Sequence, residues 1–329
     1  MATLAARAGS FLGAILVVAP GLVACGGSRS PAGSPLEAPD LGTDAGRESL
    51  SSGEPLVISV GGQDRIILVH LPAGAEGPVP LVINLHGSRF TAGQQETFSG
   101  MDATADAYGF IVAYPQAAIP SGHGFEWHVP GQPLFGGRAA PPDAPDDVKF
   151  IAAAVAAITR RASVDPKRVF VTGFSGGARM ASQVACDLSE TFAAAAAVGG
   201  LRFPSPCGAR RAVPIVAFHG TADPVNPFEG ANAPTWTYGV REAAEQWAAH
   251  DKCAGPIAES TPGPSVHRTR YTACRDAAGV ELYAIDEAGH EWPGGPPMPD
   301  SVTTPLGPQT NAVDANAVIW RFFADHPLP

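Results

Sequence analysis

Three polar residues that lie far apart in the sequence could together perform nucleophilic catalysis. Ser175 lies in the run Gly173-Phe174-Ser175-Gly176-Gly177, which fits the pattern G-x-S-x-G. A serine hydroxyl is a weak nucleophile at neutral pH, so it needs a base to accept its proton and an acid to orient that base. We assign His290 as the base and Asp223 as the acid. Taken singly, each of the three could instead be an ordinary turn or loop residue.

The segments on either side of Ser175 predict a strand, a tight turn and a helix. The apolar run Arg168–Thr172 precedes the motif, and the helix-compatible run Ala178–Leu188 follows it. On such a turn the serine hydroxyl stands clear of the backbone, and the glycines supply the room that the turn needs. The start of the helix adds partial positive charge near a developing oxyanion. This context favours a nucleophile over a plain glycine turn.

The oxyanion of such a reaction needs two hydrogen-bond donors. The backbone N–H of Gly176, directly after the serine, is one candidate. The segment Leu85-His86-Gly87-Ser88 ends a buried-type strand, and the N–H of Ser88 is the second candidate. A strand-ending glycine turn without any catalytic role is the alternative for that segment.

Other residues compete for the roles of acid and base. Asp286 is the rival acid, because it is close to His290 in the sequence. His250, on a predicted helix, and His326, in the C-terminal tail, are poorer candidates for the base. No C-x-x-C or His-x-x-x-His spacing favours a metal site. We therefore expect neither a metal nor a cofactor.

The remaining pattern alternates strands and helices, which predicts an α/β fold with a mostly parallel central sheet and helices on both faces. In such sheets ligands gather at the carboxyl ends of strands, where the three candidate loops fall. The order Ser, Asp, His along the chain is that of an α/β-hydrolase. Strands are expected at 56–60, 65–71, 81–85, 110–114, 168–172, 194–198, 214–219, 267–273 and 280–285, and helices at 95–108, 148–161, 178–188, 240–250 and 311–324.

The N-terminal region resembles an export signal and a tether. Residues 1–24 contain a single charge, Arg7, followed by an apolar run that is too short to span a bilayer. The run ends Leu22-Val23-Ala24-Cys25, which resembles the lipobox of bacterial lipoproteins and implies lipid attachment at Cys25; plain secretion is the alternative. Residues 25–54 are rich in Gly, Pro and Ser and predict a flexible tether. Residues 55–329 remain as one catalytic domain.

The charge and the cysteines restrict the partners and the compartment. The net charge is −10 and no basic run occurs, which argues against a nucleic-acid partner. Without Cys25, four cysteines remain in an exported chain, and an even number favours disulfides. Three pairings are possible. We predict the two that close short loops, rather than buried free thiols: Cys186–Cys207 and Cys253–Cys274.

Taken together, the motifs resemble a known family. The segments 85–87, 146–148, 173–180, 219–223 and 289–295 occur in the order found in exported polyhydroxybutyrate depolymerases, feruloyl esterases and acetylxylan esterases. The resemblance runs from about Val82 to Gly295, and the cysteine positions also look like those of the group. It implies an α/β-hydrolase fold and a serine carboxylic-ester hydrolase that works through an acyl-enzyme. It also implies the triad Ser175, Asp223 and His290.

Two departures from the family pattern affect the expected substrate. Ser88 stands where members often have a cysteine, so one disulfide of the group is absent. The chain also ends soon after its last predicted helix, without room for the surface-binding domain that depolymerases of solid polyester usually have. We therefore expect soluble oligomers, or aryl and acetyl esters, as substrates.

Three tryptophans in loops are candidates for lining the substrate pocket. Trp292 is next to His290, and Trp127 and Trp236 lie in other loops. Aromatic side chains at such places could contact an acyl or sugar-ester group. Packing of the loops against the domain is the alternative.

The sequence thus predicts an exported, lipid-anchored monomer that hydrolyses polyhydroxybutyrate oligomers or feruloyl or acetyl esters. Two other functions stay open at this point. One is a serine peptidase on the same fold, and the other is a cell-surface binding lipoprotein that has kept the fold without catalysis.

Overall fold

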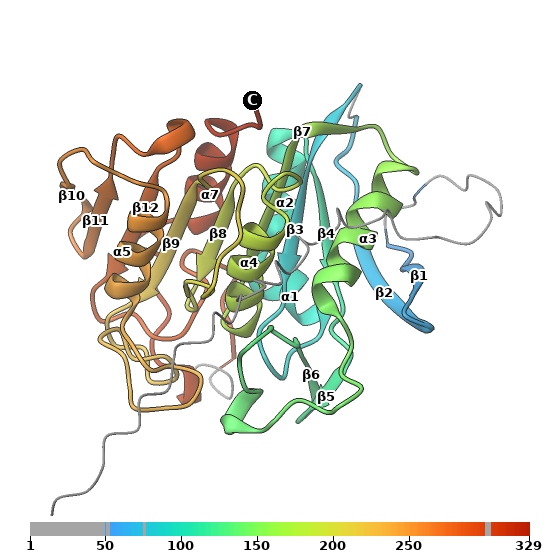
Figure 1. The fold of residues 1–329 in the computed structure, drawn as a ribbon, viewed down its shortest axis with the longest axis horizontal. Coiled ribbons are helices and arrows are strands. Elements are labelled where there is room, and N and C mark those ends of the chain that lie inside the picture. The colour runs from blue at the N-terminus through green and yellow to red at the C-terminus, as the bar shows by residue number, and fades with distance from the viewer. Residues whose placement is uncertain (1–49, 51–52, 75–76, 300–303) are drawn as a thin grey trace, which may run out of the picture. The chain divides into compact units, whose positions relative to one another are not determined.

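A ten-stranded mixed sheet forms the centre of the protein. The computed structural model describes residues 50, 53–74, 77–299 and 304–329. The strand order is β1-β2-β4-β3-β7-β8-β9-β12-β11-β10 (Figure 1). The strands are β1 (Leu56–Val60), β2 (Gln63–His70), β3 (Val79–Leu85), β4 (Ile111–Pro115), β7 (Val164–Gly173), β8 (Ala195–Val198), β9 (Ile215–Gly220), β10 (Ala258–Gly263), β11 (Val266–Tyr271) and β12 (Val280–Ile285).

In sheet order, the strands β4, β3, β7, β8, β9 and β12 run parallel to one another. Two antiparallel strands are added at each edge, β2 and β1 beside β4 and β11 and β10 beside β12. A separate antiparallel pair consists of β5 (Ile119–Ser121) and β6 (Gly124–Glu126). Because β7, β9 and β12 are parallel, their carboxyl ends lie at the same edge of the sheet. That edge carries the loops with Ser175, Asp223 and His290.

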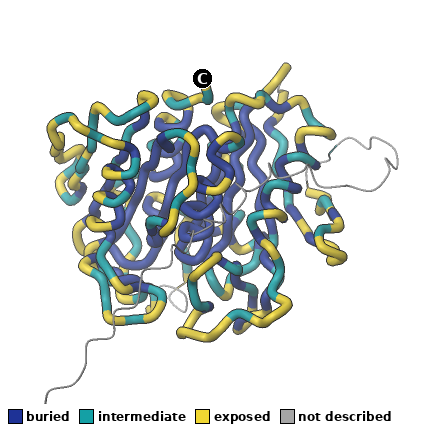
Figure 2. Tube along the Cα trace, in the orientation of Figure 1, coloured by how far each residue is buried: buried dark blue, intermediate teal, exposed yellow. Residues whose placement is uncertain are grey.

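Helices cover both faces of the sheet. In Figure 1, α3 (Asp147–Thr159), α4 (Gly176–Asp187) and α5 (Val240–His250) lie in front of it. Behind it lie α1 (Ala92–Ser99), α2 (Met101–Tyr108) and α7 (Ala315–Ala324). This confirms the expected α/β architecture, and Figure 2 shows the central strands buried between the two layers.

The apolar pattern of the strands explains the two layers. Alternate residues of a strand point to opposite faces of the sheet. In β7, Val169 and Val171 pack in the core on the α4 face, whereas Phe170 packs on the α7 face. Each central strand is therefore apolar on both sides, as expected for a parallel sheet covered on both faces.

Strands β5 and β6 lie where no strand was expected, and three further segments differ from the expectation. The helix expected at 95–108 is two helices, because Gly100 adopts a left-handed conformation with φ 59° and ends α1. Strand β10 was not predicted, since its sequence is polar and exposed at the sheet edge. The last helix begins at Ala315 rather than near residue 311. The side chain of Asp314 caps its start.

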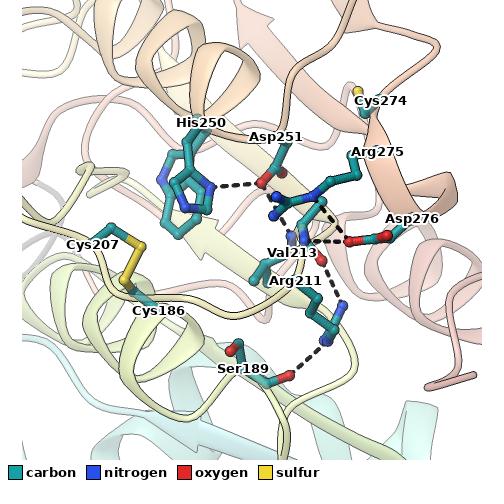
Figure 3. A network of polar contacts seen from close by, with 12 residues as sticks. Cys186, Ser189, Cys207, Arg211, Val213, His250, Asp251, Cys274, Arg275 and Asp276 are labelled. Carbon is teal, nitrogen blue, oxygen red and sulfur yellow. Dashed lines mark hydrogen bonds and ion pairs between the residues drawn. A yellow bond between two sulfur atoms is a disulfide. The ribbon is translucent and has the colours of Figure 1, made fainter. Parts of the chain in front are cut away.

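Two disulfides join elements on the α4–α5 side. They are Cys186–Cys207 and Cys253–Cys274, the pairs expected from the sequence. Beside them, Asp251 Oδ1 accepts hydrogen bonds from His250 Nδ1 at 2.8 Å and from the N–H of Val213 at 3.2 Å (Figure 3). These links tie α4 and α5 to the segments that follow them in the chain.

Several expectations fall on residues that are not described. The expected signal peptide, 1–24, and the candidate lipid site Cys25 lie outside the described residues, as does the tether apart from residues 50, 53 and 54. Among the described residues, no helix has the length and apolar character needed to cross a membrane.

Candidate active site

Ser175 occupies a strained turn between β7 and α4. Its backbone has φ 52° and ψ −113°, an unusual conformation for a residue with a side chain. Its N–H donates to the carbonyl of Val198 at 2.8 Å, which anchors the turn to the end of β8. Strain of this kind persists only where surrounding contacts hold it, and it projects the hydroxyl away from the backbone.

Glycines allow the backbones around this turn to approach closely. A Cβ placed on Gly177 would clash with the carbonyl oxygens of Leu85 and His86. A Cβ placed on Gly173 would lie 2.5 Å from the carbonyl oxygen of Gly177. The strand, the turn and the start of α4 therefore fit together only without side chains at these two positions.

Asp223 and His290 meet at the same edge of the sheet. Asp223 follows β9 and His290 follows β12, and both are buried. Asp223 Oδ2 lies 2.7 Å from His290 Nδ1. Asp223 Oδ1 accepts from the N–H groups of Val225 and Asn226, both at 2.8 Å. The carboxylate is thus held by its own loop and directed at the imidazole.

This geometry defines the protonation state of the pair. Because Asp223 accepts, His290 Nδ1 bears the proton and Nε2 is left as the acceptor. Burial lowers the pKa of His290, despite the opposing effect of Asp223, so the ring is neutral near pH 7. Burial alone would raise the pKa of Asp223, but the bonds from His219 and His290 outweigh it and hold that pKa well below its usual range.

His290 packs beside the turn that holds Ser175. Its ring lies 4.6 Å from the ring of Phe174, measured between centroids. A Cβ placed on Gly199 would lie 3.2 Å from His290 Nδ1, and one on Gly200 would clash with the carbonyl oxygen of Ser175. The loop after β8 therefore contacts both His290 and the serine turn.

The segment that contains Ser88 lies against the start of α4. A Cβ placed on Gly176 would clash with Ser88 Oγ and would lie 3.0 Å from Ser88 N. The hydrogen bonds within the described part of the chain include none from the N–H of Ser88 or of Gly176. Two neighbouring backbone donors are thus available beside Ser175.

His86 holds the Ser88 segment in place, a role that the sequence did not indicate. The N–H of Ala117 donates to His86 Nε2 at 3.0 Å, so His86 Nδ1 bears the proton and donates to the carbonyl of Gly87 at 2.8 Å. Burial lowers the pKa of His86 to about 4, which keeps the ring neutral. The Gly87 carbonyl and the Ser88 N–H belong to one planar peptide, so this bond also sets the direction of the N–H.

His219 is a second imidazole next to Asp223. Its Nε2 lies 2.7 Å from the carbonyl of Asn226 and 3.2 Å from Asp223 Oδ2. The sequence showed His219 at a strand end but did not show that it would share the carboxylate with His290. Only the fold of the loop from 220 to 226 brings the two rings to one acid.

The rival residues have other partners. Asp286 bonds His267 at 2.8 Å, and both side chains are exposed. His250 bonds Asp251, and His326 bonds the carbonyl of Phe322. Within the described ranges, no group of three His, Cys, Asp or Glu side chains could hold a metal ion.

The three loop tryptophans are buried, and their indole N–H groups bond inside the protein. Trp127 donates to the carbonyl of His86, Trp236 to that of Pro227, and Trp292 to Asn316 Oδ1. These contacts favour packing, the alternative that the sequence left open, over direct contact with substrate.

Comparison with known proteins gives one consistent result. A family model described as esterase PHB depolymerase matches residues 66–240. The protein NocK of Nocardia uniformis subsp. tsuyamanensis, which is named as an esterase, is 30% identical over 86% of this chain and 89% of its own length. Feruloyl esterase B of Piromyces equi is 32% identical over 69% of this chain but only 42% of its own length.

A solved structure has the same fold. The acetyl xylan esterase of Aspergillus awamori aligns with a TM-score of 0.54 and 19% identity, over 77% of this chain and 98% of that one. At this level of identity the likeness concerns the fold.

Proposed function

This chain belongs to the esterase PHB depolymerase family and is a carboxylic ester hydrolase, and we propose that Ser175, His290 and Asp223 are its catalytic triad. The observation that carries the proposal is the 2.7 Å contact of His290 Nδ1 with Asp223 Oδ2, beside the strained turn of Ser175. The chain order Ser, Asp, His is the one that this fold requires.

In the proposed reaction, Ser175 Oγ attacks the ester carbonyl carbon while His290 Nε2 accepts the hydroxyl proton. Asp223 stabilises the imidazolium and does not take a proton itself. His290 then gives the proton to the leaving alcohol, and an acyl-enzyme remains on Ser175. A water molecule attacks the acyl-enzyme, with His290 again as the base, and the acid product leaves.

The N–H groups of Ser88 and Gly176 hold the oxyanion of the tetrahedral intermediate. Support comes from their proximity and from their lack of other partners among the residues described. One such donor contributes about 3 kcal/mol to stabilisation of the transition state. His86 supports the Ser88 donor through the Gly87 carbonyl.

The variant Ser175→Ala tests the triad. We expect kcat on a p-nitrophenyl ester to fall by about 10⁶-fold while the fold is retained, because the nucleophile is lost and the rest of the site remains. Ser182→Ala is the matched control: this buried serine lies two turns along α4 and bonds the carbonyl of Ala178. A Ser175→Ala protein that keeps most of its activity, with Ser182→Ala unchanged, would refute the assignment.

We also propose that the chain is exported and anchored by lipid at Cys25. The apolar N-terminal run with its lipobox-like end supports export, and the two disulfides are typical of an oxidising compartment. We expect the full chain in the membrane fraction of an expressing bacterium and Cys25→Ser in the soluble fraction. Equal distribution of both proteins would contradict the anchor.

The names of the family and of its relatives suggest three substrate classes: hydroxybutyrate oligomers, feruloyl esters and acetylated xylan. A hydrolysis panel with one member of each class distinguishes them.

A further inference from the structure

Two arginines near the proposed nucleophile are buried. Arg179 lies on α4 and is 7% exposed, and Arg202 lies in the loop after β8 and is 4% exposed. In the described part of the chain neither forms an ion pair. Arg202 Nη1 donates to the carbonyl of Leu201 at 3.2 Å, but its Nη2 is buried and has no hydrogen-bond partner among the described residues. An unpaired buried cation costs free energy, so native proteins seldom retain one without a reason.

The two guanidinium groups also repel each other. Burial, with a smaller contribution from the charge of Arg179, lowers the pKa of Arg202 to about 9, although Tyr238 acts in the opposite direction. Burial lowers the pKa of Arg179 to about 10. The exposed carboxylate of Glu242 favours the charged form of Arg202 from a distance, without an ion pair between them. An anion from outside the chain would remove the repulsion and supply the missing hydrogen-bond acceptor.

The backbones of both arginines lie close in space to the backbone of Ser175. Arg179 is four residues after Ser175, which is about one helical turn or 6 Å. Gly200 contacts the carbonyl oxygen of Ser175, and Arg202 follows two residues later, at most about 7 Å along an extended chain. The charge of Arg179 also acts on His290, whose pKa it lowers. The pair is thus adjacent to the proposed catalytic residues and is separate from them.

A cavity of about 390 Å³ opens beside Arg202. Its walls include Gln183, which follows Arg179 by one turn of α4, and Phe203 and Tyr238. Arg202 is clamped over the rings of Trp236 and Tyr238, 3.1 and 4.3 Å from their centroids. The disulfide Cys186–Cys207 ties the far end of the Arg202 loop to α4. The cation is therefore held rigidly at a cavity of ligand size.

We propose that Arg179 and Arg202 bind a carboxylate that the ester substrate carries a few atoms from its scissile bond. The inference rests on the proposed function, because it places the scissile ester at Ser175. Among the three suggested classes it favours oligomers of hydroxy acids, since every such chain ends in a free carboxylate. A neutral acetylated polysaccharide has no group that would pair with the two cations.

Paired substrates test the inference. We would measure kcat/KM for the linear 3-hydroxybutyrate dimer and for its terminal carboxamide, which differ in charge and hardly in shape. We expect the wild type to prefer the acid by tenfold or more, the size of a charge-assisted hydrogen bond. Arg202→Gln and Arg179→Gln should each reduce that preference at least tenfold, mainly through KM. Arg210→Gln, at an exposed arginine paired with Glu190, should leave the preference unchanged.

A second measurement needs only the wild type. We expect free 3-hydroxybutyrate to inhibit hydrolysis of p-nitrophenyl butyrate competitively, at least tenfold more strongly than its amide does. If the acid and the amide gave equal kcat/KM values and equal inhibition, the anion site would be refuted. Hydrolysis of p-nitrophenyl butyrate in the same experiment would still show that the protein is an esterase. A folded wild type that hydrolyses no ester would instead refute the proposed function, which distinguishes the two failures.

Discussion

At the scale of single residues, Asp223 organises the proposed site. One of its oxygens accepts from two N–H groups of its own loop, and the other lies within 3.2 Å of nitrogen atoms of both His219 and His290. A carboxylate held in this way remains ionised and keeps the proton of His290 on Nδ1. The Nε2 atom is then the position at which the imidazole accepts a proton from the nucleophile.

The pH dependence of the reaction follows from His290. Since burial lowers its pKa below the usual 6.5, the neutral base persists below that value. We expect kcat/KM on a neutral ester to stay level as pH falls to 6.5 and to decline only at lower pH, where His290 takes up a proton. A decline that is already complete above pH 7 would contradict the assignment.

The lowered pKa of His290 also makes the stability of the fold depend on pH. The pKa of His290 is lower in the folded state than in the unfolded state. The neutral ring therefore contributes to the free energy of unfolding above the unfolded-state pKa, and this contribution is lost as pH falls through the folded-state pKa.

Asp223→Asn tests the orientation of the imidazole. An amide at this position can donate to Nδ1, which would leave the proton on Nε2 and block acceptance from the nucleophile. We expect kcat to fall by about 10⁴-fold with little change in KM. Asp286→Asn, at the exposed acid that pairs with His267, is the control and should keep full activity. If Asp286→Asn abolished activity and Asp223→Asn did not, Asp286 rather than Asp223 would be the acid that orients the imidazole.

At the scale of elements, the turn between β7 and α4 requires that the backbones of β3, β7 and α4 lie in close contact with one another. Gly177 contacts the end of β3, and its position has no room for a methyl group because the neighbouring atoms are backbone carbonyls. The strand, turn and helix could be predicted from the motif and its apolar flanks. Strand β10 could not be, since its polar residues resemble a loop and are ordered by pairing with β11.

Gly177→Ala should therefore destabilise the protein by about 3 kcal/mol or more, because backbone atoms must shift. Gly93→Ala is the matched control, since a Cβ there would meet Leu68 Cδ1 at an ordinary 3.8 Å. Alanine also favours a helix over glycine, so this variant should be neutral or slightly more stable. Urea unfolding followed by circular dichroism measures both, and equal midpoints would show that the turn tolerates the side chain.

At the scale of the whole molecule, six parallel strands bring loops from distant parts of the sequence to one edge. The sequence predicts this convergence, because each candidate residue follows an apolar strand. It does not predict that Arg179 and Arg202 form no ion pair with any other described residue, since pairing depends on which side chains the fold places nearby. The shared use of Asp223 by His219 escaped prediction for the same reason.

The disulfides stabilise the domain as a whole. Cys253–Cys274 closes a loop with a sequence separation of 21, and its loss should reduce the free energy of unfolding by about 3 kcal/mol. The double variant Cys253→Ser/Cys274→Ser, unfolded in urea without reductant, measures this effect. Ala254→Ser, at an exposed neighbour, is the control and should remain within about 0.5 kcal/mol of the wild type. An unchanged midpoint in the double variant would show that the bond does not stabilise the fold.

Covalent labelling of the folded enzyme with a fluorophosphonate tests the central claim most directly. Mass spectrometry of the digested protein should find one modified residue, Ser175, and the label should be lost in His290→Ala because the hydroxyl then lacks its base. A modified serine elsewhere, or full labelling of Ser175 without the imidazole, would show that these side chains do not act together.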